Sequence, residues 1–164
     1  MIASSLATIA LPDYARVWIY AADRAFTQQE EEIINSWLAE FITNWNSHGN
    51  NLTAAAEILE HQIILFAVDE SKTPVSGCSI DKSVALLRKI EKHMNVNLLD
   101  GGRVCYKNQH QIVVLRLPQI KQAIEAQHIK TDTWILNIQA NNLGDIKNNL
   151  FVPAAQSWMA RYFR

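Results

Sequence analysis

The sequence has too few cysteines and too little excess charge for several common classes of protein. Its two cysteines, Cys78 and Cys105, form neither a disulfide framework nor a zinc-binding signature. We therefore expect free thiols and a cytoplasmic location, since the cytoplasm keeps thiols reduced. Fifteen Lys and Arg residues against sixteen Asp and Glu residues give a formal net charge of -1. This balance lacks the basic excess of nucleic-acid-binding proteins, so we expect no nucleic-acid partner.

The chain also lacks long apolar runs, clustered metal ligands and low-complexity linkers. The apolar stretch over residues 1–11 is too short to span a bilayer, and no basic segment precedes it. We interpret residues 1–12 as a mobile or edge-packed tail and expect no membrane span. The five histidines are scattered as single residues, so we expect no metal site and no cofactor. A chain of 164 residues without a linker predicts one domain.

Hydrophobic patterning predicts a mixture of strands and helices. Thr27 and Glu30 have the spacing of a capping box at the start of a helix that would end before Gly49. Residues 63–68 are continuously apolar, as in a strand covered on both faces. Residues 53–60 fit a strand or a helix, because Ala and Glu favour helix while their surroundings favour sheet. The expected strands are 16–20, 53–60, 63–68, 103–107, 111–117 and 134–138, and the expected helices are 27–48, 81–94, 118–126 and 154–163.

The order of these elements predicts an α+β fold. Residues 16–107 run strand, helix, strand, strand, helix, strand, which is the order of a ferredoxin-like βαββαβ sandwich. Residues 108–164 would then form a C-terminal extension of that sheet or a small lobe. We expect a single domain consisting of the tail, this core and the extension.

The stretch from Ser76 to Ser83 breaks the apolar pattern with residues that chemistry can use. We interpret it as a turn between strand and helix in which Gly77 supplies the bend. The unpaired amides at the start of the following helix carry partial positive charge. A small anion could bind there through these amides, the Ser76 and Ser79 hydroxyls and Lys82. Asp69, at the end of the preceding strand, is a further candidate ligand-binding residue.

Cysteine-dependent catalysis at Cys78 is the alternative. A thiol at a helix N-terminus near Lys82 loses its proton more easily and becomes a nucleophile. No histidine is placed beside it by spacing, and Cys78 could equally be a small buried hydrophobe beneath a helix capped by Ser79 or Asp81. Because a cysteine without a fixed base is weak evidence, we favour a binding or interaction module over an enzyme.

The apolar residues 63–68 followed by Asp69 and Glu70 also look like a Walker B strand, which in ATPases holds magnesium. An ATPase of that kind needs the phosphate loop G-x-x-x-x-G-K-[ST] as well. The nearest segment, Gly77 to Ser83, has Asp81 before the lysine, and it follows the strand instead of preceding it. We therefore do not expect P-loop ATPase activity.

Several segments together resemble a small family of soluble bacterial proteins of uncharacterised activity. They are Val-Trp-Ile-Tyr at 17–20, Val-Asp-Glu-Ser at 68–71, Ser-Gly-Cys-Ser-Ile-Asp-Lys-Ser-Val at 76–84, and residues 153–158. Members of this family often carry the label ABC transporter ATPase. The resemblance covers nearly the whole chain and implies a bacterial source, but it transfers no activity and no site residues.

Five tryptophans are candidates for a protein interface. Trp18, Trp37 and Trp45 lie on elements that should face inward. Trp134 and Trp158 are better placed for a homodimer contact or a patch that binds another protein, with core packing as the alternative.

Overall fold

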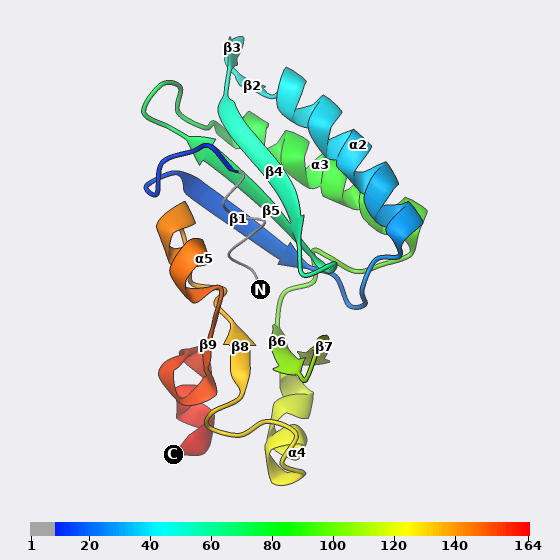
Figure 1. The fold of residues 1–164 in the computed structure, drawn as a ribbon, viewed down its shortest axis with the longest axis vertical. Helices are drawn as coiled ribbons and strands as arrows, with labels where there is room; N and C mark the ends of the chain where they lie inside the picture. Colours follow the sequence, from blue (N-terminus) through cyan, green and yellow to red (C-terminus); the bar gives the residue numbers. More distant parts are fainter. Residues whose placement is uncertain (1–8) are drawn as a thin grey trace.

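The computed structural model describes residues 9–164, which form two antiparallel sheets (Figure 1). Most of the predicted tail, residues 1–12, therefore lies outside the described residues. The first sheet has the strand order β1-β5-β4 and the second the order β7-β6-β8-β9, while β2 and β3 form a small separate ribbon. Helices and antiparallel sheets together confirm the expected α+β class.

The elements of the described chain agree in kind with most of those expected from the pattern. They are β1 (Arg16–Ala21), α2 (Gln28–Asn44), β2 (Asn46–Ser47), β3 (Asn50–Asn51), β4 (Thr53–Leu59), β5 (Ile63–Asp69), α3 (Gly77–Met94), β6 (Arg103–Asn108), β7 (Gln111–Arg116), α4 (Ile120–Glu125), β8 (Trp134–Leu136), α5 (Leu143–Asn149) and β9 (Phe151–Pro153), with 3-10 segments at Leu117–Gln119, Ala154–Gln156 and Trp158–Phe163.

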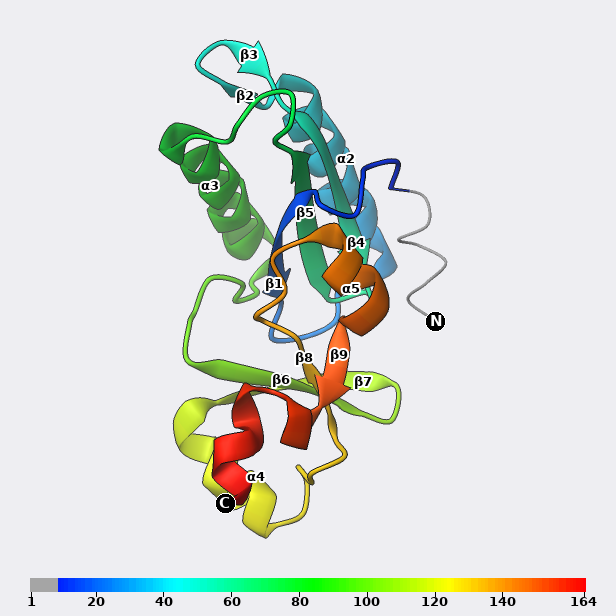
Figure 2. The same cartoon turned by 90° about the vertical axis from the view of Figure 1, so that its left-hand side faces the viewer.

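Strand β5 is the centre of the first sheet, as its continuous apolar sequence predicts. All seven of its residues are buried, because helices α2 and α3 cover one face and the C-terminal half of the chain covers the other (Figures 1 and 2). Strand β4 pairs with β5 along its whole length. Residues 53–59 are thus a strand, and pairing with a buried neighbour outweighs the helical preference of their alanines.

The ferredoxin-like sandwich is not the observed topology. Its expected fourth strand, β6, leaves the first sheet and pairs with β7 and β8 instead. The place beside β1 is taken by a later segment, because the Val17 amide donates to the Asn141 carbonyl at 3.1 Å. The boundary that we expected at residue 107, between the ferredoxin-like core and the C-terminal extension, therefore falls inside the β6–β7 hairpin. Six consecutive residue pairs join these two strands, so the hairpin stays together in one sheet.

Several helix boundaries also differ from expectation. Helix α2 has the predicted Thr27–Glu30 capping box but ends at Asn44, because the chain turns into the β2–β3 ribbon through Gly49 at φ 82°. The expected terminal helix 154–163 is two 3-10 segments. Ser157 separates them, since its Oγ donates to the Ala154 carbonyl at 2.8 Å and accepts from the Met159 amide at 3.0 Å.

The two sheets share a buried core. Apolar residues of β1 and β5 pack there against Cys105, Phe151 and helix α5. A second cluster fills the space between the first sheet and helices α2 and α3, and a third lies between the second sheet and the C-terminal segments. Among residues 9–164, no helix is both long and apolar enough to cross a membrane.

Candidate functional site

The predicted loop is the capped beginning of helix α3, which starts at Gly77, four residues earlier than expected. The Ser76 Oγ accepts from the Ser79 amide at 3.2 Å, and the Ser79 Oγ accepts from the Ser76 amide at 3.4 Å. Ser79 is fully buried, and its Oγ also donates to the Asn46 carbonyl at 2.9 Å. Both hydroxyls are therefore engaged in the helix cap, and that of Ser79 also joins the helix to the β2–β3 ribbon.

Gly77 and Cys78 are the first two residues of this helix, and both are exposed. Gly77 is therefore not the bend that we predicted, because the chain turns before Ser76. The thiol of Cys78 is free and exposed, so its interpretation as a buried hydrophobe is wrong. Asp81 is exposed as well and is not the cap. Cys105 differs: it is 6% exposed, and burial raises the pKa of its thiol to about 11.

Asp69 and Glu70 hold the turn that leads from β5 to α3. The Asp69 Oδ1 accepts from the Ser71 amide at 3.0 Å and from the Ser71 hydroxyl at 2.6 Å. These bonds hold the pKa of Asp69 below its ordinary value. The Glu70 Oε1 accepts from the Val75 amide at 3.0 Å and lies 3.5 Å from Arg16 Nη1. The carboxylates of Asp69 and Glu70, which follow the strand that looks like a Walker B strand, thus bind protein groups.

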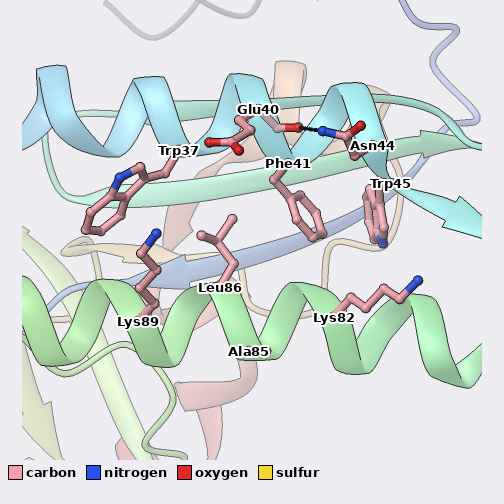
Figure 3. Close-up of a pocket in the computed structure, with 9 residues that line it drawn as sticks. All are labelled: Trp37, Glu40, Phe41, Asn44, Trp45, Lys82, Ala85, Leu86 and Lys89. Atoms are coloured by element: carbon pink, nitrogen blue, oxygen red, sulfur yellow. Dashed lines mark hydrogen bonds between the residues drawn. The ribbon is translucent and has the colours of Figure 1, made fainter.

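Lys82 belongs to a different feature, a groove between helices α2 and α3 (Figure 3). The groove has a volume of about 410 Å³. The α2 wall carries three aromatic rings spaced four residues apart, and the α3 wall carries mainly small or aliphatic side chains between two lysines. Its lining consists of Trp37, Glu40, Phe41, Asn44, Trp45, Lys82, Ala85, Leu86 and Lys89.

The aromatic wall of the groove is fixed in place. The Trp45 Nε1 donates to the Ser79 carbonyl at 2.8 Å, and Trp45 is only 2% exposed. Its ring centroid lies 4.9 Å from that of Phe41 and 5.8 Å from that of Phe66 in β5. Such packing gives the rings few alternative rotamers, so the groove is formed before any ligand arrives.

The charges around the groove differ between its two ends. Lys82 points toward the Trp45 end, and among residues 9–164 no acidic group forms an ion pair with it (Figure 3). At the other end the Lys89 Nζ lies 4.1 Å from the centre of the Trp37 ring. The Glu40 carboxylate lies at that same end (Figure 3). Lys82 is therefore the less compensated positive charge of the groove.

Sequence reasoning missed this groove because the α2 stripe was interpreted entirely as core. Ile34 and Leu38 are indeed buried, but Trp37 and Phe41 are only partly buried. The signal in the sequence was a second stripe at 37, 41 and 45, whose Phe41 and Trp45 rings pack on Phe66 of β5 while Trp37 lies against Lys89 of α3. A helix packed on a sheet needs one such stripe, so a second aromatic one indicates another surface.

The C-terminal half offers weaker sites. Trp134 is 51% exposed and lines a hollow of about 270 Å³ with Lys107 and Lys147. Each lysine has an acidic partner, Glu60 at 3.3 Å and Asp13 at 3.1 Å, so neither charge is free. Trp158 is partly buried and packs against the third core cluster. Residues 9–164 contain no group of three or more His, Cys, Asp or Glu side chains arranged for a metal.

Comparison of the chain with protein-family models, with curated proteins and with solved structures gave no match. The resemblance to a bacterial family therefore stays a prediction.

Proposed function

We propose that the protein is a binding module that holds a small organic anion in the groove between α2 and α3. The observation that carries the proposal is the unpaired ammonium of Lys82 at one end of a rigid aromatic groove. In this proposal the anion expected near residues 76–83 binds beside Lys82, while the Ser76 and Ser79 hydroxyls support the helix.

The size of the groove favours a small molecule over a protein partner. Its volume of about 410 Å³ lies toward the lower end of the range of small-molecule pockets, about 300 to 1,000 Å³. A stable protein interface buries about 1,200 Å² or more, whereas this groove extends over only two to three turns of each helix. The partly exposed rings of Trp37 and Phe41 suit an apolar body, and Lys82 suits a negative group.

The fluorescent sulfonate 8-anilinonaphthalene-1-sulfonate tests the proposal, because it combines an aromatic body with one negative charge. We expect saturable binding to the folded protein, and a loss of affinity of about fivefold or more in Lys82→Ala. Lys92→Ala is the matched control, since Lys92 is exposed on the same helix and does not line the groove. Ala85→Trp should fill the groove and abolish binding.

Absence of dye binding to the folded protein would refute the proposal. Equal losses of dye affinity in Lys82→Ala and Lys92→Ala would also refute it, because they would indicate that the dye is attracted only to the net charge of the helix. Ala39→Trp controls for the added indole, since Ala39 is exposed on α2 outside the groove. This variant should bind the dye as the unmodified protein does.

Catalysis by Cys78 is the second candidate function, and the exposure of its thiol on the first turn of α3 favours it. Among the described residues, however, no hydrogen bond joins this thiol to a histidine. Alkylation by iodoacetamide across pH separates the two functions. Rapid reaction below neutral pH would indicate an activated nucleophile and support the enzyme, whereas reaction at the rate of a simple thiol would support the binding module.

A further inference from the structure

The charged side chains differ between the two ends of the groove, and this difference determines which anions fit it. We infer that the ligand is a linear or flat monocarboxylate whose single charge lies at Lys82 and whose uncharged end lies between Trp37 and Glu40. This inference rests on the proposed function, because it names the class of ligand that the same groove selects.

The Lys82 end suits one carboxylate. Its ammonium has no acidic partner among residues 9–164, and the nearby aromatic ring, Trp45, has its Nε1 bonded to the Ser79 carbonyl at 2.8 Å. Asn44 lines the same end and uses its Nδ2 to donate to the Glu40 carbonyl at 3.0 Å. Among the side chains that line this end, a carboxylate therefore meets one positive charge and no negative one (Figure 3).

The far end does not suit a second carboxylate. There the Lys89 ammonium lies 4.1 Å from the Trp37 ring centre, and the Glu40 carboxylate faces the same space (Figure 3). Glu40 and Lys89 form no ion pair, but both line this end of the groove, so a second anionic group would be repelled by the Glu40 carboxylate as well as attracted by the Lys89 ammonium while losing its hydration. A methyl or aryl end would instead contact Trp37 and has no charge of its own to desolvate.

The length of the groove sets the size of the acid. Lys82 and Lys89 are seven residues apart, which is about 10 Å of helix axis and about the extended length of an eight-carbon chain. Phe41 and Leu86 face the middle of this span (Figure 3). Octanoate matches the span with one charge, and suberate matches it with two.

Displacement of bound 8-anilinonaphthalene-1-sulfonate by these two acids tests the inference. We expect octanoate to displace the dye at a concentration at least about tenfold lower than suberate. In Glu40→Gln the far end becomes net positive, so suberate should displace the dye at a lower concentration than before. The ratio of the suberate to the octanoate concentration needed for displacement should then fall below about threefold. Glu32→Gln is the control, because Glu32 is exposed on α2 outside the groove, and it should leave the ratio unchanged.

The possible failures are distinguishable. If the dye binds but suberate displaces it as well as octanoate does, the inference is wrong while the proposed function stands. The same holds if neither acid displaces the dye, or if Glu40→Gln leaves the ratio unaltered. If the dye itself does not bind the folded protein, the proposed function fails and the inference fails with it.

Discussion

The two halves of the molecule bury their apolar residues with helices and strands of different length. The first half uses a buried central strand, β5, covered by helices of 17 and 18 residues, each with a capping box. The second half uses strands of three to six residues, two short helices and 3-10 segments. Only the first half can support a long straight groove, because only there do two long helices lie along one face of a sheet.

The largest expected effect comes from the core beneath the groove. Phe66 is 1% exposed, and its ring lies 5.8 Å from those of Phe41 and Trp45. Phe66→Ala should lower the free energy of unfolding by about 3 to 5 kcal/mol in chemical denaturation. Met159→Ala, a fully buried position in the terminal 3-10 segment, should cost about 2 kcal/mol, because a chain end relaxes more easily. An equal or larger loss at Met159 would contradict this difference between the halves.

A smaller effect is expected at the start of α3. Ser79→Ala leaves the partly buried Asn46 carbonyl without the donor that lies at 2.9 Å, so it should cost about 1 to 3 kcal/mol. In the second half, Ser157→Ala removes a bond to the Ala154 carbonyl in a partly buried segment and should cost about 1 kcal/mol. Thermal denaturation of both variants beside Ser36→Ala, an exposed position, checks the order. A neutral Ser79→Ala would show that the helix start does not depend on this bond.

Acid should destabilise the first half through Glu30. Its carboxylate accepts from Arg24 at 2.8 Å, which lowers its pKa from 4.5 to about 2. A lowered pKa means that the stabilisation is complete above the unfolded-state value and is lost as the pH falls from about 4.5 to about 2. Glu30→Gln should therefore cost about 1 kcal/mol at pH 7, since the partner is partly exposed, and almost nothing at pH 2. Denaturation curves across that pH range measure the difference in unfolding free energy between Glu30→Gln and the unmodified protein. A difference that persists at pH 2 would rule out the ion pair as its cause.

The smallest effect concerns the β6–β7 turn of the second half. Gln109 adopts φ 57°, a left-handed conformation that glycine enters without steric cost. Gln109→Gly should raise the free energy of unfolding by about 0.5 kcal/mol. This net gain is the relief of backbone strain minus the cost of the entropy that glycine adds to the unfolded chain. The matched Glu60→Gly, at φ 53°, should stabilise less, because Glu60 also pairs with Lys107 at 3.3 Å. A larger gain at Glu60 would show that this ion pair contributes nothing.

The same contrast explains which parts of the fold could be predicted from the sequence. The Thr27 capping box and the buried β5 strand were correct, because local patterns in long elements suffice to specify them. The partner of β6 was wrong, because nothing local distinguishes the edge of β1 from a new sheet. Short 3-10 segments carry too few residues for a period to be recognised.

The candidate site was predictable only in part. Local spacing placed Ser76, Cys78 and Ser79 in a turn just before a helix, whereas Ser76 is the cap and Cys78 and Ser79 already lie in the first turn of that helix. Their roles depend on groups distant in the sequence: Asn46 accepts from Ser79, and α2 forms the opposite wall of the groove beside Lys82. A single sequence does not show which two helix faces meet.

The shared core implies that this chain cannot be divided into two stable pieces. Gln62 is 3% exposed, and its Nε2 donates to the carbonyl of Ala22 at 2.8 Å and to that of Ile112 at 3.2 Å. Truncation after α3 would leave this amide half satisfied and would expose Leu65 and its apolar neighbours to water. Such a fragment would aggregate, so the groove exists only while the C-terminal half remains attached beneath it.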